Sequence, residues 1–370
     1  MIRFNNPYTS KIFKNIENFR QFSSNGKYNK ICQRWLVKEI KCKDALMVHS
    51  CTGALEMSAI LLNIKKGDEI IMPSYTFVST ANAFVLRGGT PVFVDIDKHT
   101  CNIDVSKIEK AITSKTKAIV AVHYAGISCD MDRIMKIAKK FNLYVIEDAA
   151  QAILSNYKGK PLGSIGDLAT LSFHETKNIH CGEGGALLIN NAKFIKRAKI
   201  IRDKGTNRDL FNQNKVNKYT WVDYGSSYGL SEINAFFLYT QLKLAKEITK
   251  KRISLFKQYY RLLENLETNG FIKRPFIPNY ASTNGHIFYI VIKNKIRNNL
   301  IKHLKQKKIS SVFHYIPLHN SAFGKKKTIT RSDMKNTNNL SKNLLRLPLH
   351  TKLNKNNVLK ICSEINNFFK

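Results

Sequence analysis

Short apolar runs alternate with amphipathic segments along the first half of the chain. The apolar runs, each with the length of a buried strand, are at 45–50, 68–73, 90–96, 117–123 and 143–149. The segments between them, with apolar residues at helical spacing, are at 52–64, 77–89, 105–112 and 131–142. Because such alternation is typical of a mainly parallel sheet with helices on both faces, we predict an α/β domain here.

The alternating pattern changes further along the chain. Two apolar runs, 168–173 and 186–190, flank a polar segment that contains one lysine and several glycines. Residues 203–228 then form a long polar stretch with a tryptophan and three tyrosines. Loops of this length in compact domains are often functional, so we expect a functional role for this one.

The C-terminal third predicts a smaller α+β unit. A long helical pattern with a bend, 230–266, leads into it. The elements that follow are a strand at 287–292, a helix at 299–308, a strand at 310–316 and a helix at 354–369. We therefore predict a large domain with an N-terminal arm, 1–245, and a small C-terminal domain with the long connecting helix, 246–370.

Composition narrows the class of protein. The chain has 370 residues, of which 43% are hydrophobic, as in globular proteins with a sizeable core. Its apolar runs fall short of the roughly 18 residues that span a bilayer, and its first residues lack the apolar core of a secretion signal. Seven scattered cysteines without a CxxC pair predict reduced thiols and no metal site. We expect a cytoplasmic protein without membrane insertion.

The formal net charge of +35 has two interpretations. One is nucleic-acid binding, and the other is a compositional bias that favours lysine, isoleucine and asparagine. The lysines are spread along the whole chain and accompany no nucleic-acid recognition motif. We therefore favour the compositional bias and expect no nucleic-acid partner, although a positive surface would favour an anionic substrate.

Three segments at the ends of predicted strands carry chemistry. In "VIEDAAQA" (145–152), Glu147 and Asp148 end an apolar run, and either one caps the next turn or one is a buried acid paired with a cation. In "SCTGALEM" (50–57), small residues open a helix, which is either an ordinary cap or a cup for a phosphate group.

The third segment is "SFHETKNIHCGEGG" (172–185), which holds Lys177 between two apolar runs. A lysine in a surface turn is the simple interpretation. A partly desolvated lysine is instead a nucleophile that condenses with an aldehyde. The glycines of "GEGG" (182–185) allow the backbone to approach closely.

Taken together, these segments predict one cofactor. Pyridoxal 5'-phosphate needs a lysine for its aldehyde, an acid for its ring nitrogen and a cup for its phosphate. The acid keeps the ring protonated, so that the ring absorbs the electrons of a carbanion.

The order of these segments resembles that of the DegT/DnrJ/StrS sugar aminotransferases. These are pyridoxal phosphate enzymes with the aspartate aminotransferase-like fold (fold type I), in which a large domain with a mainly parallel sheet is followed by a smaller α+β domain. The resemblance covers nearly the entire chain. It rests on "GDEIIMPSYTFVSTANAFVLRGG", "VHYAG", "SFHETKN", "KGTNR", "KYTW" and "FHYIPLH".

The resemblance assigns roles at the cofactor. It implies that Lys177 holds the aldehyde and later moves a proton, that Asp148 pairs with the ring nitrogen and that Gln151 lies near the phenolic oxygen. Phe77 matches an aromatic residue that stacks on the ring. The positions that match phosphate contacts are Thr52, Gly53, Ala54 and Ser172.

Other positions match the family less fully. Many members carry "GxNxRM", which the partner subunit contributes to the site, but this chain has "GSSYGL" (225–230), with Ser227 in place of the asparagine that reaches the phosphate. Three residues of "FHYIPLH" match a substrate-side loop, with a packing or surface role as the alternative: His314, Tyr315 and His319. Tyr219 and Trp221 either border the nucleotide or anchor their own loop.

The resemblance also implies a reaction and an assembly. L-glutamate would donate its amino group to a nucleotide-linked keto sugar, dTDP-4-dehydro-6-deoxy-D-glucose, in a homodimer with residues of both subunits at each site. The products would be dTDP-4-amino-4,6-dideoxy-D-galactose and 2-oxoglutarate. A different keto-sugar nucleotide, UDP-linked or of other stereochemistry, is the alternative substrate. A non-catalytic regulatory relative is the alternative class, and the presence of Lys177, Asp148 and Gln151 argues against it.

Overall fold

A large, mostly parallel sheet forms the centre of the computed structural model, which describes residues 1–6, 22–293 and 296–370. Its strand order is β1-β9-β8-β5-β4-β2-β3-β12. The strands are β1 (Asp44–Val48), β2 (Glu69–Pro73), β3 (Thr90–Val94), β4 (Thr116–Val122), β5 (Tyr144–Asp148), β8 (Leu168–Ser172), β9 (Gly185–Ile189) and β12 (Ile329–Thr330). Only β9 runs antiparallel to its neighbours within this sheet, so the predicted mainly parallel sheet is confirmed.

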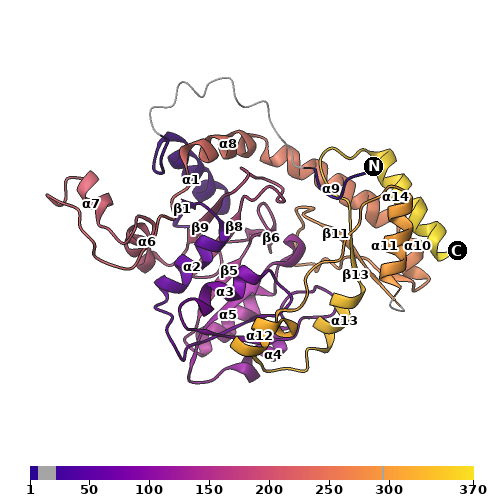
Figure 1. Ribbon diagram of the computed structural model, residues 1–370, viewed down its shortest axis with the longest axis horizontal. Helices are drawn as coiled ribbons and strands as arrows, with labels where there is room; N and C mark the ends of the chain where they lie inside the picture. The colour runs from indigo at the N-terminus through magenta and orange to yellow at the C-terminus, as the bar shows by residue number, and fades with distance from the viewer. Residues whose placement is uncertain (7–21, 294–295) are drawn as a thin grey trace.

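Helices cover both faces of this sheet, because alternate strand residues are apolar on both sides (Figure 1). One face packs on α1 (Lys27–Ile40), α4 (Val105–Ala111), α5 (Met131–Lys140) and α8 (Glu232–Lys243). The other face packs on α2 (Cys51–Leu61), α3 (Val78–Val85) and α6 (Ile195–Arg202). The strands and helices predicted for the first half of the chain are confirmed within a few residues.

The C-terminal part has its own core. A three-stranded antiparallel sheet joins β10 (Ile272–Lys273), β11 (Phe288–Ile292) and β13 (Leu344–Leu347). The helices α9 (Ala245–Leu262), α11 (Arg297–Gln306) and α14 (Lys355–Phe369) pack with it, at the right of Figure 1. The small predicted α+β unit is therefore present, and its chain also returns to the large sheet through β12, which pairs with β3.

The predicted strand at 310–316 is wrong. Only Val312 bridges to Arg346 there, and the strand of the small sheet is β13 instead. The apolar residues Phe313 and Ile316 are exposed, while the ring of Tyr315 stacks on that of His314. The alternating apolar residues at 310–316 therefore belong to a loop, because their side chains do not cover a face of the sheet.

The long helical pattern at 230–266 is confirmed, with its bend at Leu244. α8 ends at Lys243, α9 follows from Ala245, and α10 (Glu264–Thr268) completes the segment. The remaining short elements are β6 (Asn156–Tyr157), β7 (Lys160–Pro161), α12 (Ala322–Lys327), α13 (Lys335–Asn343) and the 3₁₀ turns Tyr124–Gly126, Ala192–Phe194 and Leu318–Asn320.

Residues 203–228 form an arm that extends from the body of the molecule (Figure 1). A short helix, α7 (Arg208–Asn212), lies within this predicted loop. Single bridges from Asp203 to Ser227 and from Thr206 to Trp221 hold its two sides together. Of the helices in the described part of the chain, none has the length and apolar character needed to cross a membrane.

Candidate active site

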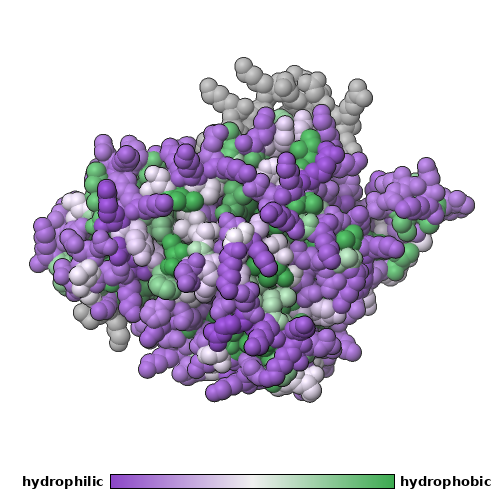
Figure 2. Space-filling view, turned by 180° about the vertical axis from the view of Figure 1, so that it is seen from behind, coloured by the Kyte–Doolittle hydropathy of each residue, from purple (hydrophilic) through white to green (hydrophobic). Residues whose placement is uncertain are grey.

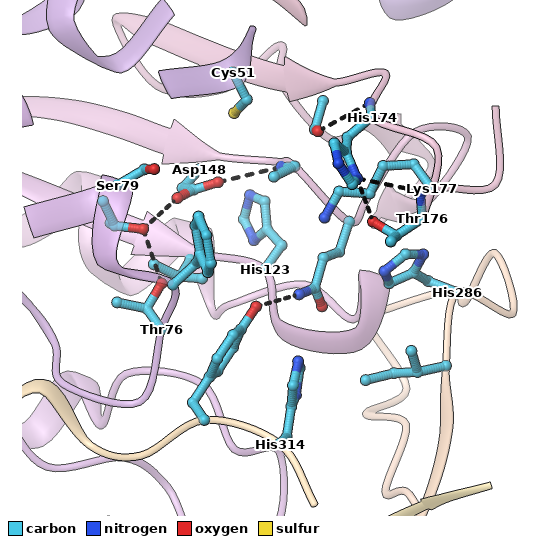
Figure 3. A pocket seen from close by; sticks show the side chains of 18 of the residues that line it. Cys51, Thr76, Ser79, His123, Asp148, His174, Thr176, Lys177, His286 and His314 are labelled. Carbon is cyan, nitrogen blue, oxygen red and sulfur yellow. Dashed lines mark hydrogen bonds between the residues drawn. The ribbon is translucent and has the colours of Figure 1, made fainter. Parts of the chain in front are cut away.

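A cavity of about 620 Å³ opens at the edge of the large sheet where β1, β4, β5 and β8 end. These ends share one edge because β1 and β8 both run antiparallel to β9, while β8, β5 and β4 are parallel. The carboxyl edge of such sheets is the usual place for ligands. Figure 3 shows Lys177 and Asp148 pointing into this cavity, with the ring of His123 between them in this view.

The carboxylates of Glu147 and Asp148 face opposite sides of the sheet, because successive strand residues alternate. Asp148 lines the cavity, where its Oδ2 accepts a hydrogen bond from Thr80 Oγ1 of α3 at 2.7 Å. Its Oδ1 accepts from the N–H of Ala150 at 3.2 Å. A nearly buried carboxylate held this way is suited to pair with a protonated ring nitrogen.

Glu147 has a structural environment. Its Oε1 accepts from the N–H groups of Ile165 and Gly166, and its Oε2 accepts from the N–H of Gly163 and from His123. Burial alone would raise the pKa of Glu147, but these hydrogen bonds outweigh it and lower that pKa. Of the two predicted candidates, Glu147 therefore fixes the turn after β5, and Asp148 faces the cavity.

Lys177 lies in a tight loop between β8 and β9, as the sequence pattern indicated. Backbone bonds from Lys177 N–H to His174 O and from Cys181 N–H to Phe173 O close the loop. Burial lowers the pKa of Lys177, although the nearby Cys51 and Asp148 oppose the change. An amine that loses its proton more readily is a better nucleophile.

The start of α2 forms the predicted phosphate cup only in part. Thr52 and Ser172 line the cavity, and Thr52 Oγ1 lies 2.7 Å from Ser79 Oγ of α3. Gly53 and Ala54 lie behind it, where their N–H groups donate to the side chain and carbonyl of Ser50 at 3.0 and 3.1 Å. The cup in this structure therefore presents hydroxyl groups at a helix N-terminus, both of which suit a phosphate.

Two further predicted cofactor contacts lie at the cavity. Gln151 accepts from the N–H of Ala125 at 2.7 Å and donates to the Tyr315 hydroxyl at 2.9 Å, so its amide is held in one orientation. Phe77 precedes α3 and remains 58% exposed at the cavity, 6.4 Å from the Tyr315 ring. An exposed aromatic face beside a cavity is available for a flat ligand ring.

The predicted substrate residues divide between two places. His314 and Tyr315 line the cavity with their rings stacked 3.7 Å apart, and burial lowers the pKa of His314 well below its usual range. His319 is absent from the cavity lining, and its Nδ1 lies 2.6 Å from Ser74 Oγ at the end of β2. His319 therefore ties its loop to the large sheet.

Three residues of the arm lie outside the cavity of their own chain. Ser227 is exposed, and it bridges to Asp203 at the base of the arm. Tyr219 and Trp221 are exposed as well. In the described part of one chain, none of these three residues lines the cavity.

Sequence reasoning missed several residues of the cavity lining, and those with a chargeable side chain include His123, Arg252, His286 and Arg346. His123 ends an apolar run and so had a recognisable signal. Its ring donates to Glu147 and accepts from the N–H of Cys129. Arg252 and Arg346 gave no such signal in the sequence. A single cationic residue in a helix or strand pattern resembles a surface residue, and only the fold shows that it lies at a cavity.

The donor set fits pyridoxal phosphate. An amine with a lowered pKa, a buried carboxylate, a hydroxyl cup at a helix N-terminus and an exposed aromatic face all border one cavity. A metal centre lacks comparable support, since the described residues contain no group of three His, Cys, Asp or Glu side chains able to hold an ion.

Comparisons with known proteins agree with this chemistry. The model of the DegT/DnrJ/EryC1/StrS aminotransferase family matches residues 9–366. The uncharacterized protein MJ1066 of Methanocaldococcus jannaschii is 39% identical over 88% of this chain and 86% of its own. The spore coat polysaccharide biosynthesis protein SpsC of Bacillus subtilis is 32% identical over 90% of this chain and 87% of its own.

A solved structure extends the likeness to nearly every residue. Spr1654 of Streptococcus pneumoniae superposes with a TM-score of 0.91 and 26% identity over 99% of this chain and 98% of that chain. It has been solved in its pyridoxamine phosphate and pyridoxal phosphate forms. The predicted fold and cofactor are thus confirmed, and the chain belongs to the DegT/DnrJ/EryC1/StrS family of pyridoxal phosphate-dependent sugar aminotransferases.

Proposed function

We propose that this enzyme transfers the amino group of L-glutamate to carbon 4 of dTDP-4-dehydro-6-deoxy-D-glucose. The products are dTDP-4-amino-4,6-dideoxy-D-galactose and 2-oxoglutarate. The main observation behind the proposal is that Lys177 and Asp148 line the same cavity in a chain of the DegT/DnrJ/EryC1/StrS aminotransferase family. The substrate rests on sequence stretches that resemble the dTDP-4-amino-4,6-dideoxygalactose transaminase of enterobacterial common antigen synthesis. SpsC supports a place in polysaccharide biosynthesis.

The chain's own residues divide the work. Pyridoxal phosphate supplies the electron sink when bound. Asp148 would keep the ring nitrogen protonated, while Thr52 and Ser172 would hold the phosphate and Phe77 would cover the ring. Gln151, fixed by Ala125 and Tyr315, faces the phenolic oxygen.

Lys177 has two successive roles in the proposal. It would hold the aldehyde of the cofactor, and as a free amine it would accept the proton from the α-carbon of the amino donor. A positioned general base contributes typically about 10²–10⁴-fold to such a step. The lowered pKa of Lys177 favours the neutral amine that this role needs.

We also propose a homodimer in which each arm reaches the partner's cavity. The arm carries large side chains that are exposed in the single chain, namely Leu210, Phe211, Tyr219, Trp221, Val222 and Tyr224. Figure 2 shows hydrophobic side chains on this arm as it extends from a largely hydrophilic surface. In the dimer, Ser227 takes the place of the asparagine that contacts the phosphate in many relatives.

Product analysis tests the substrate. The loaded enzyme is incubated with L-glutamate and a panel of 4-keto and 3-keto sugar nucleotides carrying dTDP or UDP, and NMR determines the configuration at the aminated carbon. We expect amination of the dTDP-linked 4-keto sugar with galacto configuration. Gluco configuration or a preference for UDP supports the alternative sugar-nucleotide substrate, and no amination with any member supports a non-catalytic relative.

A further inference from the structure

A second cavity, of about 510 Å³, lies between the large sheet and the small sheet. We call it the interdomain pocket, and its walls include the loop after β3 (96–101), the strands β10 and β11, and α13, which packs on β11 (Figure 1). Among the described residues, none lines both this pocket and the cofactor cavity. Small-molecule sites have volumes of roughly 300–1,000 Å³, so the interdomain pocket is large enough for a ligand of its own.

The register of the small sheet places two lysines on the face that borders the pocket. Lys273 of β10 pairs with Val291 of β11, and the side chains of such cross-strand partners lie on the same face. Lys293 follows Val291 by two residues, so it lies on that face as well. The opposite face, with Ile290 and Ile292, packs in the small-domain core. Both lysines are accordingly among the residues that line the pocket.

The large domain contributes a third lysine, Lys98, which also lines the pocket. It lies in the turn after β3, where Asp97 Oδ1 accepts hydrogen bonds from the N–H groups of His99 and Thr100 at 3.0 and 2.8 Å. These bonds fix the turn that carries Lys98. The pocket therefore receives lysines from both of its sides.

These three lysines have no acidic partner within the part of the chain that the structure describes. Of the acids at the pocket, Asp97 is engaged in its turn, and Glu267 accepts from Arg274 Nε at 2.6 Å. Burial raises the pKa of Tyr289 well above its usual range and that of Cys101 to about 12, so neither group adds negative charge. Cations around a cavity focus a positive potential on it, which favours an anionic ligand.

A nearly buried asparagine at the pocket, Asn343, lacks a hydrogen-bond donor. Its Nδ2 donates to Asn339 O at 3.0 Å and to Asn339 Oδ1 at 2.9 Å, and these two acceptors fix the orientation of the amide. Its Oδ1 is left buried without a partner among the described residues. A buried acceptor is unfavourable unless a donor reaches it, so the pocket suits a ligand that also carries an N–H or O–H group.

Two aromatic rings lie at the pocket. Phe276, after β10, is 48% exposed, and the ring of His99 from the large domain lies 5.7 Å from its ring. An exposed aromatic face is available to a flat ligand ring, and stacking of this kind accepts any nucleobase. The pocket thus combines features that suit an anionic group, a hydrogen-bond donor and a flat ring.

Packed rings separate the interdomain pocket from the cofactor cavity. Tyr289 lines the pocket, and its ring lies 5.8 Å from that of Tyr124. The Tyr124 hydroxyl lies 2.6 Å from Nδ1 of His314, which lines the cofactor cavity. A ligand in the interdomain pocket therefore does not contact Lys177, and it binds in addition to the substrates.

We propose that the interdomain pocket binds a nucleoside diphosphate. The three lysines would hold its phosphates, Phe276 would stack on its base, and Asn343 would accept a hydrogen bond from its base or sugar. Inorganic phosphate alone would use the cations but leave the exposed ring and the amide oxygen without a contact. This site is separate from the proposed amination and does not rest on it.

The first test locates the ligand by lysine acetylation of the cofactor-loaded enzyme, with and without millimolar ADP, followed by peptide mass mapping. We expect ADP to slow acetylation several-fold at Lys98, Lys273 and Lys293. Lys302 and Lys305 are the internal controls, because they are exposed on α11 and line neither cavity. Equal rates with and without ADP at the three pocket lysines would overturn the proposal.

The second test measures the contribution of the lysines. Calorimetry gives the Kd of ADP for the loaded wild type and for the double variant Lys273→Met with Lys293→Met. We expect a Kd roughly 10- to 100-fold higher in the double variant, as for loss of hydrogen bonds between charged groups. Any ADP in the cofactor cavity would be unaffected by these substitutions.

The matched control is the double variant Lys302→Met with Lys305→Met, which removes the same charge from the same domain. It should bind ADP as wild type does. An equal loss of affinity in both double variants would show a general effect of net charge, and the proposal would fail.

The third test asks whether the base is bound. Phe276→Ala should raise the Kd of ADP roughly 5- to 100-fold, as for loss of one stacked base, and leave that of pyrophosphate unchanged. Phe323→Ala is the control, because Phe323 is 56% exposed and lines neither cavity. If Phe276→Ala leaves the Kd of ADP unchanged, the pocket binds phosphate alone and the assignment of a nucleotide is wrong.

Discussion

Neighbouring residues of β5 have different roles because their side chains alternate across the sheet. The sequence predicted a carboxylate pair but left open which member was structural. Glu147 accepts backbone N–H groups of the following turn, whereas Asp148 contacts α3 at the cavity. The position of both carboxylates at the end of an apolar strand was predictable, but the partner of each oxygen depends on loops that only the fold brings together.

Substitutions at these two positions should separate stability from catalysis. Asp148→Asn should lower kcat/KM by about 10- to 100-fold, as for a hydrogen bond to a charged group, with little change in stability. Glu147→Gln should lower the free energy of unfolding by about 2 kcal/mol, because a buried amide cannot accept all four bonds. Urea unfolding and steady-state kinetics measure both effects. Equal effects of the two substitutions on stability would contradict the assignment.

The protein without cofactor should be destabilised by its own lysine. The pKa of Lys177 is lower in the folded state than in the unfolded state, so between these values the unfolded chain binds the extra proton. Stability therefore rises with pH in that window. Lys177→Met should be more stable than wild type at neutral pH, and the difference should shrink as pH approaches the unfolded value near 10.5. Thermal melts across pH test this, and a difference independent of pH would contradict it.

At the scale of elements, the contact between β9 and the start of α2 shapes the cofactor site. A Cβ on Gly185 would lie 2.4 Å from the backbone nitrogen of Cys51, so only glycine allows this approach. The glycines of "GEGG" indicated from the sequence that the backbone approaches another segment closely. The sequence did not indicate which segment, because β1 and β9 are far apart in the chain.

Gly185→Ala should therefore separate β9 from α2. We expect a loss of about 1–3 kcal/mol in unfolding free energy and weaker cofactor binding, measured by absorbance titration. Gly182→Ala is the matched control in the same loop. Its added Cβ meets nothing within 4 Å, but its φ of +81° imposes backbone strain of about 1–2 kcal/mol. It should lose stability and keep cofactor affinity, and equal affinity losses in both variants would contradict this account.

Other elements show which features of the fold the sequence pattern predicted and which it did not. The regular α/β half and the presence of a bend in the long helical pattern were predicted from periodicity, but the position of the bend was not. We propose the domain boundary at 245, where α9 begins. The pattern at 310–316 misled because its alternating rings line the cavity or face solvent. β13 was missed, since its four residues are too few for a periodic signal.

At the scale of the whole molecule, two features of the surface bear on function, namely its positive charge and the arm. The net charge is +35, and the face of the molecule in Figure 2 is largely hydrophilic. Such a surface favours the approach of anionic amino acids and sugar nucleotides. The arm was predicted as a functional loop, but the role that we propose for it requires a second chain, whose position a sequence pattern does not reveal.

The proposed dimer makes activity depend on the arm. The double substitution Trp221→Asp and Tyr224→Asp places charges among its exposed aromatic residues. We expect a shift from dimer to monomer in sedimentation velocity, together with loss of turnover. Lys215→Asp, also exposed on the arm but outside the aromatic group, is the control and should leave both unchanged. A monomeric wild type, or an active monomeric variant, would contradict the proposal.

The central claim is that the amine of Lys177 is the attachment point of pyridoxal phosphate. Borohydride reduction of the loaded enzyme, followed by peptide mass mapping, tests it most directly. We predict a single reduced cofactor label on the peptide that contains Lys177. A label on another lysine, or no label at all, would contradict the account.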